Sequence, residues 1–158
     1  MHDKQPEFGK VKAQPDWKIA IVRSLWHGEL TSALSADAEA ALIKAGMKED
    51  NIIFVEAPGS FEVPLLAQEA IENMQVHGVI ALGVIIQGET HHARILAETT
   101  ATGLMDLQLR TGVPVTFDIL YVNTMEDARK RCSGAGGKGA LAAHTLLTTL
   151  AKLSKLRS

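Results

Sequence analysis

The sequence lacks the features that mark most exported, membrane-bound or nucleic-acid-binding proteins. A single cysteine, Cys132, excludes an internal disulfide and fits a reducing compartment. The longest apolar run, Val79–Ile86, is interrupted by Gly83 and is too short to be a membrane helix. A formal net charge of −2 provides no strong field to attract nucleic acid or a membrane surface. We therefore expect a cytoplasmic protein that binds neither nucleic acid nor membrane.

The N-terminal segment also lacks the apolar stretch of a signal peptide. Residues 1–16 are polar and contain two prolines, which predicts a flexible N-terminal tail. The rest of the chain has an ordinary globular composition, because the whole sequence of 158 residues is 46% apolar and 22% charged. A chain of this length can bury roughly 70% of its unfolded surface. We therefore expect residues 17–158 to form a single domain.

Short β-branched runs alternate with amphipathic helical patterns along the chain. The patterns predict strands at residues 17–22, 51–56, 77–83 and 113–120, and helices at residues 29–45, 61–74, 91–110, 124–132 and 140–153. Strand–helix units repeated in this way indicate a parallel sheet that is covered on both faces. The predicted fold is α/β, a three-layer α/β/α arrangement of flavodoxin-like type with four strands.

Unusual side chains gather in the loops that follow the first three predicted strands. Ligands of such sheets bind beyond the carboxyl ends of the strands, so these loops should meet at one end of the molecule. The residues concerned are Trp26, His27, Ser60, Glu62, Glu89, Thr90, His91 and His92. Their coincidence favours a real pocket over scattered surface polarity.

The stretch Gly83–His92 (GVIIQGETHH) carries the strongest chemical signal. It leads from a buried strand into a helix, and the N-terminus of a helix favours an anion such as phosphate. A histidine beside that anion can transfer protons near neutral pH. The simpler interpretation is a glycine turn followed by two solvated histidines. A metal site is not expected, because positions 94, 95 and 96 offer no second ligand at helical spacing.

Several other residues allow two interpretations. Trp26 could stack on a flat ring or cover the core, and Glu62 could bind ligand hydroxyls or only pair with a helix dipole. Residues Gly134–Gly139 match the pattern G-x-G-x-x-G, but a helix precedes them rather than a strand, which argues against a dinucleotide site. The flanking Arg131 and Lys138 could contact an anion or simply be solvated.

Three motifs together resemble the lumazine synthase family, the penultimate enzymes of riboflavin synthesis. They are the pair Trp26-His27, the segment Pro58–Pro64 (PGSFEVP) and the stretch Gly83–His92. The resemblance extends from about residue 17 to residue 153. It implies a transferase that condenses 5-amino-6-(D-ribitylamino)uracil with 3,4-dihydroxy-2-butanone 4-phosphate. The product would be 6,7-dimethyl-8-ribityllumazine, formed with release of phosphate and water and without a metal or redox cofactor.

The resemblance also implies roles for the residues at matching positions. Those expected to bind the substrates are Trp26, His27, Gly59, Ser60, Phe61, Glu62, Ile85, Ile86, Phe117 and Lys138. The phosphate would contact Gly88, Glu89, Thr90 and Arg131, and the expected catalytic residues are His92 and Arg131. Members of the family form homopentamers with sites between subunits, and some assemble into shells of 60 subunits. Phe117 would then reach the site of a neighbouring subunit.

The chain departs from the family pattern at a few positions. Gln87 stands where an arginine is usual, Ala93 where an aromatic residue is usual, and Arg94 where an acidic residue is usual. If Arg94 lay close to His92, it would tend to lower the pKa of the histidine. The loop 133–139 is one residue shorter than usual. These departures motivate an alternative, a non-catalytic binder of flavins or lumazines or a shell-forming protein on the same scaffold.

Overall fold

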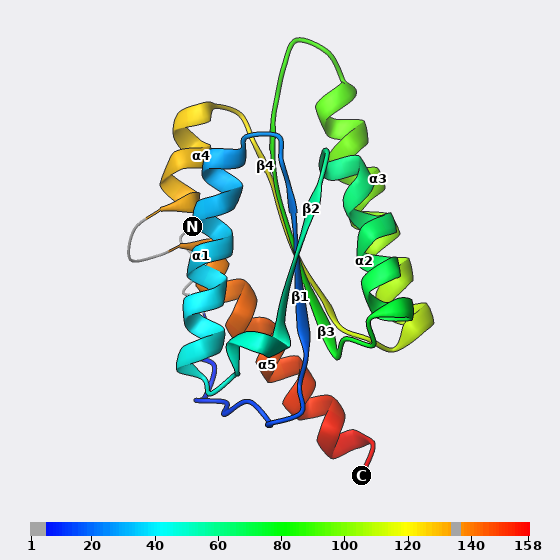
Figure 1. The fold of residues 1–158 in the computed structure, drawn as a ribbon. Helices are drawn as coiled ribbons and strands as arrows, with labels where there is room; N and C mark the ends of the chain where they lie inside the picture. Colours follow the sequence, from blue (N-terminus) through cyan, green and yellow to red (C-terminus); the bar gives the residue numbers. More distant parts are fainter. Residues whose placement is uncertain (1–5, 134–136) are drawn as a thin grey trace.

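A parallel sheet between two layers of helices forms the protein (Figure 1). The computed structural model describes residues 6–133 and 137–158. Its strands are hydrogen-bonded in the order β2-β1-β3-β4 and all run parallel. They span β1 (Ile19–Ser24), β2 (Ile52–Ala57), β3 (Gly78–Ile86) and β4 (Val115–Val122). The predicted three-layer α/β/α, flavodoxin-like fold is confirmed.

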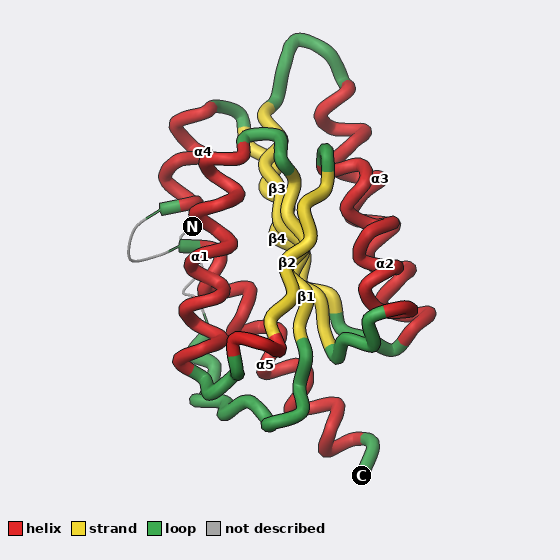
Figure 2. Tube along the Cα trace, viewed as in Figure 1, coloured by secondary structure: helices red, strands yellow, loops and turns green. Residues whose placement is uncertain are grey.

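The helices divide between the two faces of the sheet (Figures 1 and 2). One face is covered by α1 (Gly28–Lys44), α4 (Met125–Cys132) and α5 (Lys138–Leu156), and the other by α2 (Val63–Asn73) and α3 (His92–Thr111). Short 3-10 turns, η1 (Glu49–Asn51) and η2 (Ser60–Glu62), flank β2. Within the described residues, none of the helices has the length and apolar character needed to cross a membrane.

β3 lies in the middle of the sheet and is buried along its whole length except at Ile86. Ile80 and Leu82 belong to the core under α1, α4 and α5, whereas Val79 and Ala81 belong to the core under α2 and α3. A strand that is covered on both faces needs apolar residues on both faces. This requirement explains why the segment is a continuous apolar run rather than an alternating pattern.

The predicted end of this strand at Gly83 is wrong, because β3 continues to Ile86. Gly83 does not form a turn; it pairs with Ile119 of β4. A side chain there would collide with Ser60, since a Cβ atom on Gly83 would lie 2.7 Å from the Ser60 Oγ. The glycine is therefore explained by close packing across the sheet face. Ile85 and Ile86 therefore lie on the strand rather than in the loop predicted to follow it.

Other boundaries also extend beyond the predicted ones. β4 ends at Val122 rather than at residue 120, because its ladder follows the longer β3 up to the pair Ile86 and Val122. α5 begins at Lys138 rather than at residue 140 and runs to Leu156 rather than to residue 153. Of the predicted glycine-rich connection 133–139, residues 134–136 lie outside the described part of the chain.

The segment before β1 contacts the rest of the fold. The Ala13 N–H donates a hydrogen bond to the Ala45 carbonyl at the end of α1, with an N···O distance of 2.8 Å. Ala13 and Trp17 are buried, and Val11 packs against the same core. The predicted tail, residues 1–16, thus includes a stretch that lies along the core under α1 and α5.

A close approach between the backbones of α1 and α5 sets a stability test at Gly139, near the start of α5. A Cβ atom on Gly139 would lie 2.1 Å from the Leu34 carbonyl oxygen of α1. We expect Gly139→Ala to lower the free energy of unfolding by about 1–3 kcal/mol, because α1 and α5 must separate to admit the methyl group. Urea denaturation at a fixed protein concentration measures the change.

Gly103 in the middle of α3 provides the matched control. A Cβ atom there meets only Pro64, at 3.6 Å, which is an ordinary contact. Gly103→Ala should therefore be neutral or stabilising by up to about 1 kcal/mol, because alanine favours the helix. Equal unfolding midpoints for the two variants would contradict the proposed packing of α1 against α5.

Candidate active site

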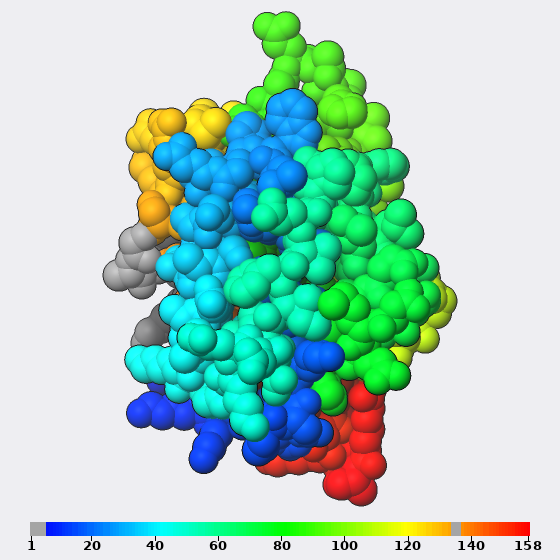
Figure 3. Space-filling view, viewed as in Figure 1, coloured from blue at the N-terminus to red at the C-terminus, as the bar shows by residue number. Residues whose placement is uncertain are grey.

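A cavity of about 350 Å³ lies at the carboxyl ends of β1 and β3. It opens at the end of the molecule where the loops after β1, β2 and β3 lie, drawn uppermost in Figures 1 and 3. Most of the side chains around it come from the three segments that the sequence singles out, and the others lie just beyond the third. The lining residues are Trp26, His27, Ser60, Val84, Ile85, Ile86, His92, Ala93 and Leu96. Six of the predicted site residues are thus brought together in one chain.

Three lining residues, Val84, Ala93 and Leu96, are not among the predicted site residues, and of these only Ala93 stands out in the sequence, as a departure from the family pattern. Leu96 follows His92 by four positions in α3, and this spacing places both side chains on one helix face. Val84 lies on β3 two positions before Ile86, so the two share a face of the strand. The positions of Val84 and Leu96 beside the cavity can be inferred once the strand and the helix are known. The two-residue repeat of the strand puts Val84 on the same face as Ile86, and the helical repeat puts Leu96 on the same face as His92.

Trp26 projects from the loop after β1 and is 69% exposed. It therefore does not cover the core, which was the alternative interpretation. Its indole ring lies 6.5 Å from the His27 imidazole, between ring centres, with the planes tilted by 55°. His27 holds a left-handed backbone conformation, with φ of 54°, directly before α1. The pair presents an open aromatic surface at the mouth of the cavity.

The loop after β2 fits closely against Trp26. A Cβ atom on Gly59 would lie 3.0 Å from the indole Cδ1 and 3.4 Å from the Glu62 Oε1, so only glycine admits both neighbours without a shift. Ser60 is buried and lines the cavity. Phe61 is exposed and, like Gly59 and Glu62, lies beside the cavity rather than in its wall. This segment therefore supplies one lining residue and three neighbours.

β3 leaves part of its backbone open at the cavity. Its pairing with β1 ends at Arg23 and Leu82, whereas its pairing with β4 continues to Ile86 and Val122. Within the described chain, the β1-facing backbone edge from Gly83 to Ile86 therefore has no strand partner. Unpaired N–H and C=O groups at the end of a parallel sheet can bind a planar ligand edge-on.

The loop between β3 and α3 contains the residues predicted to hold phosphate. Gly88, Glu89 and Thr90 are exposed and lie next to the cavity without lining it. α3 begins at His92 rather than at the predicted residue 91, with His91 as the capping position. The Thr90 Oγ1 accepts a hydrogen bond from the His92 N–H over 3.4 Å. The loop thus leads directly into the residue predicted to transfer protons.

The sequence matches a family profile over nearly its whole length. The profile is described as 6,7-dimethyl-8-ribityllumazine synthase and covers residues 16–154. The chain belongs to the 6,7-dimethyl-8-ribityllumazine synthase family. The resemblance found in the three motifs is thereby confirmed, and the cavity lies where those motifs meet.

Curated relatives in this lumazine synthase family match most of the chain. A 6,7-dimethyl-8-ribityllumazine synthase of Xanthomonas oryzae pv. oryzae is 39% identical over 140 residues, covering 86% of this chain and 91% of the relative. The enzyme of the same name from Levilactobacillus brevis is 38% identical over 144 residues, covering 89% and 92%. A solved GDP-L-fucose synthetase from Naegleria fowleri matches 99% of this chain and 50% of its own, at 13% identity and a TM-score of 0.46, too low to bear on function.

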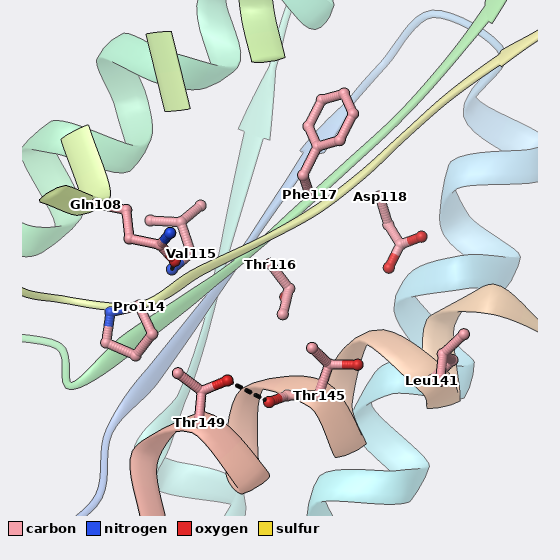
Figure 4. A pocket seen from close by; sticks show the side chains of 9 residues that line it. All are labelled: Gln108, Pro114, Val115, Thr116, Phe117, Asp118, Leu141, Thr145 and Thr149. Carbon is pink, nitrogen blue, oxygen red and sulfur yellow. Dashed lines mark hydrogen bonds between the residues drawn. The ribbon is translucent and has the colours of Figure 1, made fainter. Parts of the chain in front are cut away.

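Three of the predicted site residues lie away from the Trp26 cavity. Phe117 stands on β4, where it is 45% exposed. It lines a second cavity of about 310 Å³ between β4 and α5 (Figure 4). Arg131 lies exposed in the last turn of α4, and Lys138 is the first residue of α5. In one chain of the lumazine synthase family, these three residues therefore do not line the Trp26 cavity.

Arg94 has an acidic partner of its own. Its Nε lies 2.8 Å from the Glu98 Oε1, one turn further along α3, and both side chains are exposed. The hydrogen bond and the charge of Glu98 raise the pKa of Arg94. The guanidinium group is thus engaged by Glu98. The departure at position 94 is accommodated within α3 by a pair at helical spacing.

Asp118 lines the second cavity and is not among the site residues predicted from the sequence. Burial raises the pKa of its carboxyl group to about 6, and the nearby charge of Lys138 opposes the shift. The surrounding polar groups are hydroxyls of α5 and β4, including Thr116, Thr145 and Thr149. The sequence does contain a signal for Asp118, because an acidic residue between Phe117 and Ile119 is unusual on a predicted strand.

The described residues contain no cluster of metal-ligating side chains and no exposed thiol. In residues 6–133 and 137–158, no three His, Cys, Asp or Glu side chains gather closely enough to hold a metal ion. Cys132 is free and fully buried. Burial, with a smaller contribution from Asp37, raises the pKa of its thiol to about 11. A thiol in this state is a packing group rather than a nucleophile.

The raised pKa of Asp118 leads to a pH-dependent stability test. The folded state holds the proton more tightly than the unfolded state, so this group makes folding less favourable as pH rises from about 4 through about 6. We expect Asp118→Asn to stabilise the protein at pH 8 and to change little at pH 4. The shift of roughly two units sets an upper limit of about 3 kcal/mol, which partial exposure reduces.

Unfolding curves at both pH values, compared with those of the parent chain, measure this difference. Asp50→Asn, at an exposed aspartate in η1, is the matched control and should show no such pH-dependent gain. A loss of stability at pH 8 in Asp118→Asn would mean that attraction to Lys138 outweighs the burial of the carboxylate.

Proposed function

We propose that this chain condenses 5-amino-6-(D-ribitylamino)uracil with 3,4-dihydroxy-2-butanone 4-phosphate to form 6,7-dimethyl-8-ribityllumazine, releasing phosphate and water. The main support is that Trp26, Ser60 and His92, from three separate segments, line one cavity in a chain of this family. We place the reaction in the cytoplasm, which the lone, reduced Cys132 supports.

The pyrimidine substrate fits the open side of the cavity. The exposed indole of Trp26 offers a face for its ring. At the end of β3, the Ile86 N–H and C=O face the edge that β1 leaves open and offer a donor and an acceptor for the uracil groups, whereas those of Ile85 face β4. Ser60, Glu62 and His27 lie beside this edge and are suited to bind the hydroxyls of the ribityl chain. Stacking and edge recognition together would fix the orientation of the ring.

The phosphate-bearing substrate fits the loop before α3. Gly88, Glu89 and Thr90 would contribute backbone N–H groups, and the helix dipole adds favourable charge. Arg131 would add the full positive charge that the loop lacks. The substrate would then lie between the phosphate loop and the stacked pyrimidine, with its carbonyl group near His92.

The reaction itself consists of proton transfers between two reactive partners. Schiff base formation, loss of phosphate and ring closure each require a proton to be added or removed. His92, in the cavity wall and at the start of α3, is suited to this work near neutral pH. Orientation of the two substrates can supply much of the remaining acceleration.

The separation of the predicted site residues supports a site that is shared between subunits. We propose a homopentamer in which Phe117, Arg131 and Lys138 of one chain complete the Trp26 cavity of the next. β4 is an edge strand, and Phe117 and Tyr121 lie exposed along it. An edge with exposed aromatic side chains favours association. Light scattering would distinguish a pentamer from a shell of 60 subunits.

The activity test compares two substitutions. We expect Arg131→Ala to reduce kcat/KM more than His92→Ala, because water can replace a proton shuttle more readily than it can replace a charge on phosphate. The loss for His92→Ala should lie near the lower end of the roughly 100- to 10,000-fold range typical of general acid–base catalysis. Product is measured by lumazine absorbance, with subtraction of the uncatalysed condensation of the two substrates.

Arg129→Ala, at another exposed arginine of α4, controls for loss of charge and helix stability and should retain activity. Equal losses for Arg131→Ala and His92→Ala, or the reverse order, would contradict the assigned roles. If the parent chain bound lumazine but formed none above the uncatalysed rate, it would be a binder rather than an enzyme.

A shared site can be tested by mixing two inactive variants. Trp26→Ala and Arg131→Ala damage the two groups separately, so coexpression should restore activity. Random mixing pairs an intact Trp26 group with an intact Arg131 group at about a quarter of the interfaces in a cyclic assembly. Assay of the purified mixture against each variant alone measures this. No recovery, with mixed assemblies confirmed by mass spectrometry, would place both groups in one chain's site.

A further inference from the structure

The side chain of Gln87 connects the end of the sheet to the loop before α3. Its backbone N–H donates to the Val122 carbonyl over 2.8 Å, which extends the ladder between β3 and β4 by one residue. Its side-chain Nε2 donates to the Gly88 carbonyl over 2.9 Å and to the Thr90 carbonyl over 3.2 Å. Its Oε1 accepts a hydrogen bond from the Tyr121 hydroxyl. Gln87 is thus bonded to both the sheet and the loop.

The two carbonyl partners fix the orientation of the amide group. A carbonyl oxygen can only accept, so the NH₂ end of Gln87 must face Gly88 and Thr90. The oxygen end then faces Tyr121, whose hydroxyl donates to it. Tyr121 pairs with Ile85 in the sheet, so the register of β3 and β4 fixes the backbone position of the tyrosine. The tyrosine therefore orients the amide, and the amide orients the loop.

Fixing the two carbonyls also fixes two N–H groups. In a trans peptide the C=O of one residue and the N–H of the next point in opposite directions. Binding of the Gly88 and Thr90 carbonyls to Gln87 therefore turns the N–H groups of Glu89 and His91 away from it. In residues 6–133 and 137–158, neither of these N–H groups donates a hydrogen bond to the chain. Both are available to an anion at the start of α3.

We propose that Gln87, oriented by Tyr121, is a positioning residue that prepares the loop 88–91 for the phosphate group of the second substrate. The proposal rests on the phosphate site assigned in the proposed function. Gln87 does not contact the reacting atoms in this role; it presets the peptide groups that do. A neutral amide adds no charge, so its effect lies in the geometry of the loop. The same contacts steady Thr90, whose Oγ1 accepts from the His92 N–H.

The test is a selective loss of phosphate binding in two variants. Gln87→Met keeps the length of the side chain and removes its hydrogen bonds, and Tyr121→Phe removes one hydroxyl. We expect Gln87→Met to raise the KM for the butanone phosphate and the Ki of inorganic phosphate by about tenfold, and Tyr121→Phe by about threefold. The KM for the pyrimidine should change less than about twofold in both, because the Trp26 face is untouched.

The double variant tests whether the two residues act together. If Tyr121 acts through Gln87, the double variant should lose no more than Gln87→Met alone. Gln68→Met is the matched control. The amide oxygen of Gln68 in α2 also accepts a hydrogen bond, from Arg110, but the residue lies away from the site. It should leave both KM values unchanged. Additive losses in the double variant would show that Tyr121 and Gln87 act independently.

Several outcomes would overturn the inference. They are an equal rise of both KM values, no change relative to Gln68→Met, or a fall in kcat alone. If Gln87→Met failed to fold, Tyr121→Phe would decide, because it deletes only one hydroxyl from an exposed side chain. Binding of inorganic phosphate, measured by calorimetry, separates the two proposals. Suppose that the parent chain forms no product, but that Gln87→Met binds inorganic phosphate more weakly than the parent chain does. This result would contradict the proposed enzyme activity and support the positioning role of Gln87.

Discussion

The extension of β3 beyond β1 is the constraint on which the candidate site depends. β3 is buried on both faces and is therefore fixed in place, yet its last residues pair only with β4. The cavity forms in the space that β1 leaves. Trp26 and Ser60 enter that space from the loops after β1 and β2, and His92 enters from α3. A buried strand with one open edge thus gives three separate segments of the chain a common position around which they meet.

The fold could be predicted from the sequence because each signal was local. β-branched runs, helical stripes and their alternation define a parallel three-layer sheet without any long-range information. The strand ends could not be predicted in this way. Gly83 has the appearance of a turn residue, but its lack of a side chain is required by Ser60, which is 23 positions away in sequence and adjacent in space. A close contact of this kind becomes visible only once the sheet is built.

The candidate site likewise combines features that the sequence predicts with features that only the folded structure shows. Motif resemblance identified six of the nine residues that line the cavity, and helical spacing alone could have paired Arg94 with Glu98. The contact of Gln87 with Tyr121 depends on the register of two strands, which the sequence does not specify. An arginine at position 87 could donate to the loop carbonyls but could not accept from the tyrosine hydroxyl. Glutamine at this position therefore makes sense only together with its partner on β4.

The two aromatic residues of the candidate site show why association and ligand binding would be coupled in the proposed pentamer. Trp26 and Phe117 both remain exposed in the single chain, and they lie in different cavities. Exposed aromatic surface is unfavourable in water by about 25 cal/mol per Å². A flat ligand held between the indole of one subunit and the phenyl ring of the next would bury both rings at once. Each subunit would then gain from its neighbour the apolar contact that its own sheet cannot supply, so binding of the pyrimidine would strengthen the same interface that creates the site.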